Sequence, residues 1–282
     1  MRLKHDVAKG YDPSGHGEQL AERVHASYMR QRRKVRTFVL MTQVAILLGS
    51  IGLWEIAGRL KWIDVLLFSY PSKIVGLLWD NLLEGELLPH VGVTVVETIF
   101  GFLLGTLCGT SLAAIIWWSP FLAKVLDPYI VVLNSMPKVA LGPIFIVAIG
   151  PGLGSVIAMA LAITVIITTL VVYSSFKEVD ANYIKVVRLF GGTRATVFRR
   201  VILPASFPTI VSTLKVNVGL AWVGVIVGEF LVAKQGLGYL IIYGFQVFNF
   251  TLVIGSLFVI AIAATLMYQA VAYMESKLSG RL

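Results

Sequence analysis

Six apolar segments, each long enough to cross a membrane, constrain this chain more than any other feature. An α-helix needs about 20 mostly apolar residues to span the hydrocarbon core of a bilayer. Segments of this kind run from Phe38 to Ala57, Val91 to Trp117, Tyr129 to Ile149, Leu153 to Phe176, Ser206 to Phe230 and Thr251 to Tyr273. Charged residues make up 14% of the chain, against about 25% in an ordinary soluble domain. We therefore predict an all-α integral membrane protein with six transmembrane helices.

The distribution of Lys and Arg predicts how these helices are oriented. Residues 1–37 contain nine Lys and Arg, residues 58–90 contain three, and residues 177–204 contain six. Cytoplasmic connections carry the excess of positive charge. Both termini are therefore predicted to be cytoplasmic, with Lys277 and Arg281 near the carboxyl end. We expect residues 1–37 to form a partly disordered cytoplasmic segment, unfolded over 10–19, and residues 38–282 to form the transmembrane domain.

Two further features belong to the predicted membrane interfaces. Between Pro71 and His90, the apolar residues Ile74, Leu77, Leu78 and Leu82 recur at helical spacing, which predicts a helix lying along the outer membrane surface. Tryptophans near predicted span ends are typical of interfacial anchoring; these are Trp54, Trp62, Trp117 and Trp118.

Several classes of function are excluded or disfavoured by what the sequence lacks. The chain has a single cysteine, Cys108, and none of its four histidines lies in a predicted span, so haem or metal ligation within the bilayer is not expected. It lacks the G-x-x-x-x-G-K-[ST] phosphate-binding motif and any Ser-His or Cys-His pairing within the spans. The net charge of +9 is concentrated beside apolar segments, which favours a membrane over nucleic acid. We expect no catalytic residue, metal or cofactor in this chain.

Ionisable residues within or beside the spans identify candidate polar sites, because a charged group at membrane depth costs about 2.5–3.5 kcal/mol. Glu55 and Glu229 lie near span ends, where a solvated carboxylate is expected. Glu97 is expected either to pair with a basic group or to face a cavity. Lys138 lies between Pro137 and Pro143, which must interrupt any helix that contains them.

The broken segment is the first candidate for lining a translocation path, since interrupted helices at membrane depth are tolerated against protein or water. The alternative is a packing kink, with Lys138 facing the cytoplasm. Hydroxyl and amide groups of later spans are further candidates, although Thr side chains in a bilayer usually bond to their own helix. The candidate path residues are Asn134, Met136, Pro137, Lys138, Thr164, Thr168, Asn217 and Trp222. Gly101, Gly105 and Gly109, spaced by four, predict a close-packing ridge.

A basic loop, residues 177–204, separates the fourth and fifth predicted spans. Its segment from Lys185 to Pro204 reads KVVRLFGGTRATVFRRVILP and contains five basic residues and no acid. Tyr183, Val186, Val187 and Phe190 share one helical face, and Gly191-Gly192 is typical of a helix end. Thr193 can cap a second helix, and Pro204 is expected to end it. One side of this second helix carries the apolar residues Val197, Phe198, Val201 and Ile202. The other side carries Arg194, Arg199 and Arg200. Two amphipathic helices joined at a glycine corner can lie on anionic lipid or dock a soluble protein.

The spacing in this loop resembles the EAA loop of ATP-binding-cassette (ABC) importer permeases, written E-A-A-x-x-x-G, nine residues, I-x-L-P. Gly191, Leu203 and Pro204 match that pattern, and Val201 replaces isoleucine. Lys185, Val186 and Val187 replace the triplet that gives the motif its name.

Other segments resemble permeases that serve nitrate, sulfonate, taurine and pyrimidine-precursor uptake. The matching segments are Trp54-Glu55, Ser69 to Ser72, Gly85 to Leu87, Thr94 with Gly101-Phe102, Met136 to Pro143, and Gly228-Glu229 with Gly236 to Ile241. The resemblance covers about Ile51 to Tyr273 and leaves out the first 36 residues.

The resemblance implies a bacterial inner-membrane permease that pairs with a second copy of itself. It also implies two cytoplasmic ABC ATPase subunits, which bind ATP and Mg²⁺, and an extracytoplasmic solute-binding protein. The residues implied for ATPase coupling are Tyr183, Lys185, Val186, Val187, Phe190, Gly191, Gly192, Thr193, Arg194, Leu203 and Pro204. Three other classes remain as alternatives: an ion-coupled secondary transporter, a membrane enzyme and a non-transporting membrane scaffold.

Overall fold

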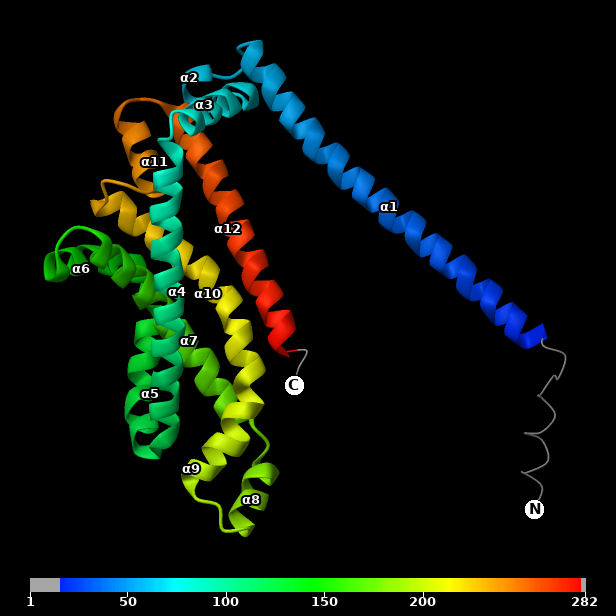
Figure 1. Ribbon diagram of the computed structural model, residues 1–282, viewed down its shortest axis with the longest axis vertical. Coiled ribbons are helices and arrows are strands. Elements are labelled where there is room, and N and C mark those ends of the chain that lie inside the picture. The colour runs from blue at the N-terminus through cyan, green and yellow to red at the C-terminus, as the bar shows by residue number, and fades with distance from the viewer. Residues whose placement is uncertain (1–15, 280–282) are drawn as a thin grey trace. The chain divides into compact units, whose positions relative to one another are not determined.

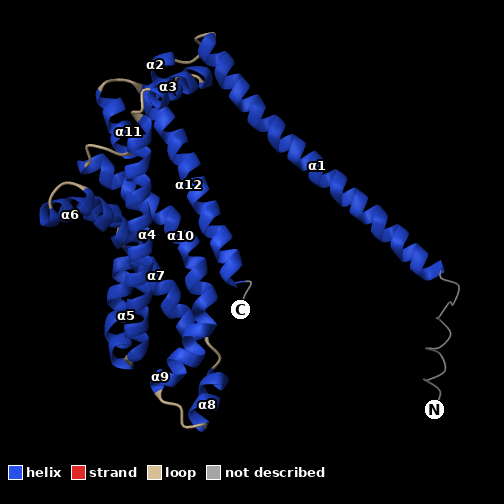
Figure 2. Cartoon of the chain, viewed as in Figure 1, coloured by secondary structure: helices blue, strands red, loops and turns tan. Residues whose placement is uncertain are grey.

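The computed structural model describes residues 16–279, which form helices joined by short connections and contain no strand (Figure 2). The chain divides into two units, one ending at Ile63 and one beginning at Asp64. The first unit contains α1 (His16–Arg59). The helices of the second unit are α2 (Val65–Phe68), α3 (Pro71–Leu83), α4 (Leu87–Trp118), α5 (Pro120–Ser135), η2 (Lys138–Leu141), α6 (Gly142–Ile149), α7 (Leu153–Glu178), α8 (Ala181–Leu189), α9 (Arg194–Val197), η3 (Phe198–Ile202), α10 (Leu203–Val232), α11 (Leu237–Gln246) and α12 (Phe250–Ser279).

The described part of the first unit contains one helix of 44 residues, whose apolar part covers Lys34–Arg59. The expected boundary between residues 37 and 38 therefore falls inside a continuous helix. The expectation of disorder is wrong for residues 16–19, which are helical, while residues 10–15 lie outside the described part of the chain. Glu55 forms an ion pair with Arg59 one turn later, so its carboxylate is partnered within its own helix.

Among residues 16–279, five helical stretches are long and apolar enough to cross a membrane, and a bent pair brings the number to six if it counts as one span. The five are Lys34–Arg59, Leu87–Trp118, Leu153–Glu178, Arg194–Val232 and Phe250–Lys277. The bent pair, Pro120–Ser135 with Lys138–Ile149, turns by 95°. The expected start of the third span at Tyr129 is wrong, because helix α5 starts nine residues earlier, at Pro120. The interruption expected from the prolines lies at Met136-Pro137. Pro137 lacks a backbone N–H and its ring crowds the preceding turn, so a helix cannot continue through it unbent.

Helices α4, α7 and α10 form the centre of the second unit, and the predicted glycine ridge lies between α4 and α7. A Cβ atom on Gly101 would lie 2.6 Å from the Cβ of Ala160, and one on Gly109 would lie 2.5 Å from the Cβ of Thr168. Gly105 faces Thr164 in the same way. Glycine at these positions lets the two helix backbones approach closely, as the spacing predicts.

The predicted surface helix is shorter than expected and packs on protein. Helix α3 starts at Pro71 and ends at Leu83, and His90 belongs to α4. Ile74 is buried, and together with Leu78 it lies against Gly255 of α12. The apolar face of α3 therefore covers another helix. Gly85, with φ +79°, makes the corner between α3 and α4.

In the second unit, α8 and α9 lie at one end of the long helices, and α3 and α11 lie at the other (Figure 1). Helices α4, α7 and α10 connect these two ends.

Candidate functional site

The glycine corner of the basic loop is built by helix caps at both sides. The Asp180 side chain accepts a hydrogen bond from the Asn182 amide at 2.8 Å and caps α8. Helix α8 ends in a turn where the Gly191 and Gly192 amides donate to the carbonyls of Arg188 and Val187, each at 2.9 Å. Gly191 has φ +78°, in the left-handed region that glycine adopts readily. The Thr193 hydroxyl then accepts from the Thr196 amide at 3.3 Å and caps α9, as predicted.

An aromatic cluster holds this loop against the bundle. The Phe198 ring lies 5.1 Å from the ring of Trp117 and 5.6 Å from that of Phe176, between ring centroids. Val197 and Ile202 are buried in the same cluster. The Arg194 guanidinium lies 5.3 Å from the Trp117 ring and donates to the Trp117 carbonyl at 2.9 Å. Trp117 therefore fixes the loop in place, a role beyond the interfacial anchoring expected from the sequence.

The outward face of α8 is an exposed apolar patch. Its members are Tyr183, Val186, Leu189 and Phe190, with 66%, 50%, 85% and 88% of their surface exposed. Val187, which was grouped with this face, instead packs inward beside Ile184. Lys185 and Arg188 are exposed on the same helix. Clustered apolar side chains among basic ones are typical of a protein-binding surface.

Pro204 does not end the second helix, contrary to expectation. Residues Phe198–Ile202 form a π-helical turn, in which the Leu203 amide donates to the Phe198 carbonyl, and the chain continues directly into α10. Pro204 has no amide to bond the carbonyl four residues earlier, and its ring would crowd that carbonyl in an α-helix. The wider π turn accommodates the proline, so the apolar helical stretch runs unbroken from Arg194 to Val232.

The interrupted helix places one group of candidate path residues at the surface. Asn134, Met136 and Pro137 are exposed and Lys138 is partly exposed. The Lys138 ammonium donates to the Asn134 carbonyl at 2.8 Å, and so caps the carboxyl end of α5. Beyond the break, Gly142 is buried against Met159 of α7 and Leu231 of α10.

The other group of candidate path residues lies inside the bundle. Thr164, Thr168 and Asn217 are 0% exposed. The Asn217 amide nitrogen donates to the hydroxyl oxygens of Thr106 at 2.6 Å and Thr168 at 2.7 Å, which joins α10 to α4 and α7. The Thr164 and Thr168 hydroxyls donate to carbonyls one turn earlier on α7, the alternative raised by the sequence. Trp222 is 4% exposed. These four side chains pack between helices, and Trp222 also borders a cavity beside Val218, Ala264 and Tyr268.

Glu229 occupies a buried network, where a solvated carboxylate was expected. It is 1% exposed. Its Oε1 accepts from the Thr94 hydroxyl at 2.7 Å and its Oε2 from the Gly238 amide at 2.6 Å. The Thr94 hydroxyl oxygen also accepts from the Leu237 amide at 2.8 Å. This network fastens the first turn of α11 to α4 and α10.

Glu97 is 2% exposed, and its Oε2 has no hydrogen-bond partner among the described residues. No ion pair joins it to a basic group within the described part of the chain.

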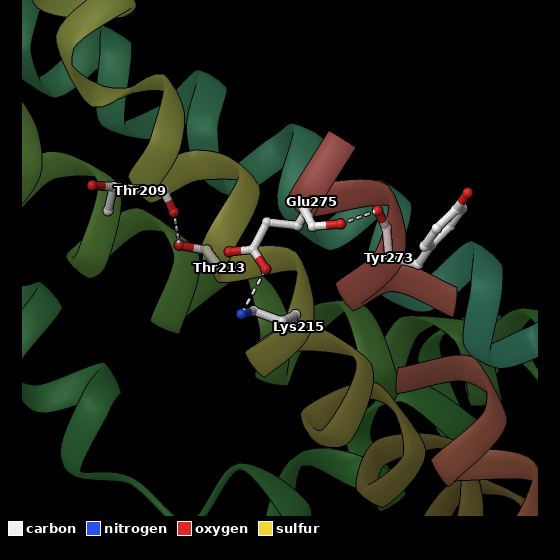
Figure 3. A network of polar contacts seen from close by, with 6 residues as sticks. Thr209, Thr213, Lys215, Tyr273 and Glu275 are labelled. Atoms are coloured by element: carbon white, nitrogen blue, oxygen red, sulfur yellow. Dashed lines mark hydrogen bonds and ion pairs between the residues drawn. The ribbon is translucent and has the colours of Figure 1, made fainter. Parts of the chain in front are cut away.

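Sequence reasoning also missed a charged pair between α10 and α12 (Figure 3). The Lys215 ammonium lies 2.6 Å from the Glu275 carboxylate, and their side chains are 27% and 17% exposed. Lys215 lies within the predicted Ser206–Phe230 span, so its charge among apolar neighbours was the signal that could have identified it.

Comparison with known proteins identifies the family to which this arrangement belongs. Residues 101–280 match the family described as binding-protein-dependent transport system inner membrane component. The chain is 28% identical over 231 residues to the putative aliphatic sulfonates transport permease protein SsuC of Bacillus subtilis, covering 81% of this chain and 83% of the relative. It is 27% identical over 241 residues to the formylaminopyrimidine transport permease protein ThiX of Halalkalibacterium halodurans, covering 86% and 96%. It is 22% identical over 267 residues to the taurine transport system permease protein TauC of Escherichia coli, covering 92% and 95%.

Solved structures show the same fold at lower identity. An inward-facing MetNI methionine ABC transporter matches with TM-score 0.59 at 19% identity, over 68% of this chain and 95% of that one. A bacterial ABC transporter involved in import of the acidic polysaccharide alginate matches with TM-score 0.61 at 14% identity, over 92% and 99%. The chain thus belongs to the binding-protein-dependent transport system inner membrane components, the permeases of ABC importers.

Proposed function

We propose that the chain is the membrane permease subunit of an ATP-driven importer for a small solute, located in the bacterial inner membrane with six spans and both termini inside. In this proposal it works as a homodimer with two cytoplasmic ABC ATPase subunits and an extracytoplasmic solute-binding protein. The chain performs no chemistry itself, and ATP and Mg²⁺ are bound by the ATPase partner. Family membership supports the permease role, and the basic loop supports the coupling role.

The observation that carries the coupling role is the exposed patch of Tyr183, Val186, Leu189 and Phe190 on α8. Each of these side chains is at least half exposed, while the opposite face of the loop is fastened to the bundle by the Phe198 cluster. A patch with these properties can fill a groove on a partner and transmit its movement without unfolding. Lys185 and Arg188 flank the patch and would orient an acidic partner surface.

In the proposed mechanism, the basic loop and the helices of the bundle move together as one rigid body. When ATP closes the ATPase dimer, each docked loop moves with its ATPase subunit. Because α9, η3 and α10 are continuous, the movement passes directly into the helices that form the bundle. Access to a central path then alternates between the two sides of the membrane.

Of the candidate path residues, those at the helix break are the exposed ones, and we propose that they line the path. We place Asn134, Met136, Pro137 and Lys138 at the path and assign the buried Thr164, Thr168, Asn217 and Trp222 to helix packing. For the solute we propose a sulfonate-, taurine- or nitrate-like anion or a pyrimidine-type precursor. The names of SsuC, ThiX and TauC support the sulfonate, pyrimidine and taurine parts of that range. A thermal-shift screen of the cognate binding protein with sulfonates, nitrate and pyrimidines would identify which of these is carried.

The docking assignment is tested by placing a charge on the patch. Phe190→Glu should leave the amount of inserted permease unchanged and reduce both copurification of the ATPase subunit and ATP-dependent uptake by at least about tenfold. The physical reason is that a carboxylate buried in an apolar interface costs several kcal/mol unless it is paired.

The matched control is Ala181→Glu, an exposed position at the start of the same helix that lies off the patch. An acid there is favourable near the helix amino terminus, so normal coupling is expected. Normal uptake and ATPase copurification by Phe190→Glu would contradict docking through this patch. Uptake that survives ATP depletion but stops with an uncoupler would instead favour an ion-coupled transporter.

A further inference from the structure

A mostly apolar cavity of about 270 Å³ lies between α10 and α12. Its lining residues are Val218, Gly219 and Trp222 of α10 and Ala264, Thr265 and Tyr268 of α12. The Thr265 hydroxyl already donates to the Ala261 carbonyl at 2.7 Å, so it needs no acceptor from an occupant. Gly219 keeps the cavity open, because a Cβ atom on it would meet nothing within 4 Å. A cavity of this kind takes an apolar ligand in preference to water.

The ion pair of Lys215 and Glu275 lies next to this cavity along the same groove (Figure 3). Lys215 precedes Val218 and Gly219 by three and four residues, and residues with that spacing are neighbours on a helix surface. Glu275 follows Tyr268 by seven residues, which is two turns along one face of α12. The two charged side chains are 27% and 17% exposed, so a ligand in the groove can reach both.

The charged pair and the cavity lie at different depths in the membrane. Glu275 is two residues from the end of the apolar stretch Phe250–Lys277, which places the pair near the membrane interface. Seven residues of helix then place the cavity about 10 Å nearer the membrane centre. Apolar side chains beside the groove are exposed, as expected of a surface that faces lipid; these are Val216, Val223, Ile262 and Leu266. A phospholipid has the same order, with a charged head followed by acyl chains.

The two charges distinguish between phospholipid head groups. A phosphate beside Lys215 is also close to the Glu275 carboxylate, whose oxygen lies 2.6 Å from the Lys215 Nζ, and the two anions repel each other. A head that carries a primary ammonium beside its phosphate satisfies both side chains. Its phosphate accepts from Lys215 and its ammonium donates to Glu275. A choline head has no N–H to donate, and a glycerol head has no positive charge.

We infer that the groove between α10 and α12 binds a zwitterionic phospholipid with a primary ammonium, such as phosphatidylethanolamine. The head group lies at Lys215 and Glu275, and one acyl chain fills the cavity beside Trp222. This site goes beyond the proposed function, because it requires a membrane but no ATP, solute or partner protein.

The experiment uses the purified full chain, stripped of lipid, and measures binding by native mass spectrometry. The probes are phosphatidylethanolamine, phosphatidylcholine and phosphatidylglycerol with identical acyl chains. The wild type should bind the ethanolamine lipid at least about tenfold more tightly than the other two, the effect of one additional charge-assisted hydrogen bond.

Substitutions of the pair test the head-group contacts. Glu275→Gln should abolish the preference for the ethanolamine lipid over the glycerol lipid, since Lys215 then attracts any phosphate without a competing carboxylate. Lys215→Met should weaken the binding of all three lipids. The control is Lys277→Met, because the Lys277 ammonium is exposed and lies over the Tyr273 ring, 4.6 Å from its centroid. A pair that only fastened α10 to α12 would change stability in Glu275→Gln without changing the lipid preference.

A substitution in the cavity tests the acyl-chain contact. Gly219→Leu places a side chain in the groove without a collision and should lower the affinity for the ethanolamine lipid by about tenfold, since buried apolar contact is lost. Gly92→Leu is the matched control. Gly92 is exposed on α4, and a Cβ atom on it also meets nothing within 4 Å, so normal lipid binding is expected.

Three results would overturn the inference: equal affinity of the wild type for the three lipids, an ethanolamine preference that survives Glu275→Gln, or normal affinity in Gly219→Leu. A wild-type preference for the glycerol lipid would also overturn it, by assigning the groove to an anionic lipid. If Lys215→Met fails to fold, Glu275→Gln and Gly219→Leu still decide. These measurements need no ATPase partner, so their failure is distinct from a failure of the importer proposal.

Discussion

Gly192 is a position in the basic loop that has no room for a side chain, although Gly191 is the glycine that matches the EAA spacing. A Cβ atom on Gly192 would lie 2.6 Å from the Val187 carbonyl oxygen, whereas a Cβ on Gly191 would meet nothing within 4 Å. Gly192→Ala should therefore displace α8 from α9 at a cost of about 1–3 kcal/mol, the range for overpacking. We expect lower ATPase copurification and a lower unfolding temperature, measured on the purified complex.

Gly191→Asn is the matched control for this prediction. The backbone at 191 is left-handed, with φ +78°, and Asn adopts that region more readily than other residues with side chains. Near-normal coupling is expected because the added side chain points into open space. If Asn at 191 proved as damaging as Ala at 192, the corner would depend on backbone freedom and not on close packing.

Features within one helix could be predicted from the sequence, whereas contacts between helices could not. The glycine ridge could be predicted because Gly101, Gly105 and Gly109 mark one face of one helix. Thr94 with Glu229, and Lys215 with Glu275, are pairs between helices, and no local periodicity determines which residues meet across such an interface. The hydroxyl groups of Thr164 and Thr168 were ambiguous for a related reason, since a path-lining and a packing Thr have the same spacing.

The π-helical turn at Phe198–Ile202 sets the rotation of the basic loop about the axis of α10. Replacing Pro204 with Ala restores an amide and removes the ring, so an α-helical register becomes available to this segment. That change would rotate α9 by about one residue, or about 100°, relative to α10. We expect Pro204→Ala to keep or raise the unfolding temperature while lowering the ATP hydrolysis stimulated by the solute-loaded binding protein.

Pro208→Ala is the control for this prediction. Pro208 is exposed and lies inside α10, six residues after the end of the π turn. Pro208→Ala should stabilise the helix without rotating the loop, so ATP hydrolysis should remain close to the wild-type value. Equal loss of hydrolysis in the two variants would show that the π turn has no special part in coupling.

Among the elements, those with strong local signals were predicted and those fixed by tertiary contacts were not. The long apolar helices, the glycine corner with its Thr193 cap and the break near Pro137 follow from apolar length, capping residues and proline chemistry. The start of the third segment at Pro120 was missed because residues 120–128 carry charges that conceal its apolar face. The continuation through Pro204 was missed because proline normally ends a helix, and only the π turn makes room for it.

At the scale of the whole molecule, the two ends of the second unit differ in charge in the way that a membrane orientation requires. The 177–204 connection carries six Lys and Arg, and residues 64–90 of the same unit carry one, Lys73. The docking proposal places the first of these on the cytoplasmic side, together with α8 and α9, and places the α3–α4 corner outside.

Cysteine accessibility tests this sidedness in intact cells. The single native cysteine, Cys108, is exposed and is first replaced by Ala. A new cysteine at Glu84, on the α3–α4 corner, should react with a membrane-impermeant maleimide added outside. A new cysteine at Arg188, on α8, should react only after the membrane is opened, because both original side chains are exposed but lie at opposite ends of the helices. Labelling of the Arg188 position from outside would place the apolar patch away from any cytoplasmic ATPase and would exclude coupling through the basic loop.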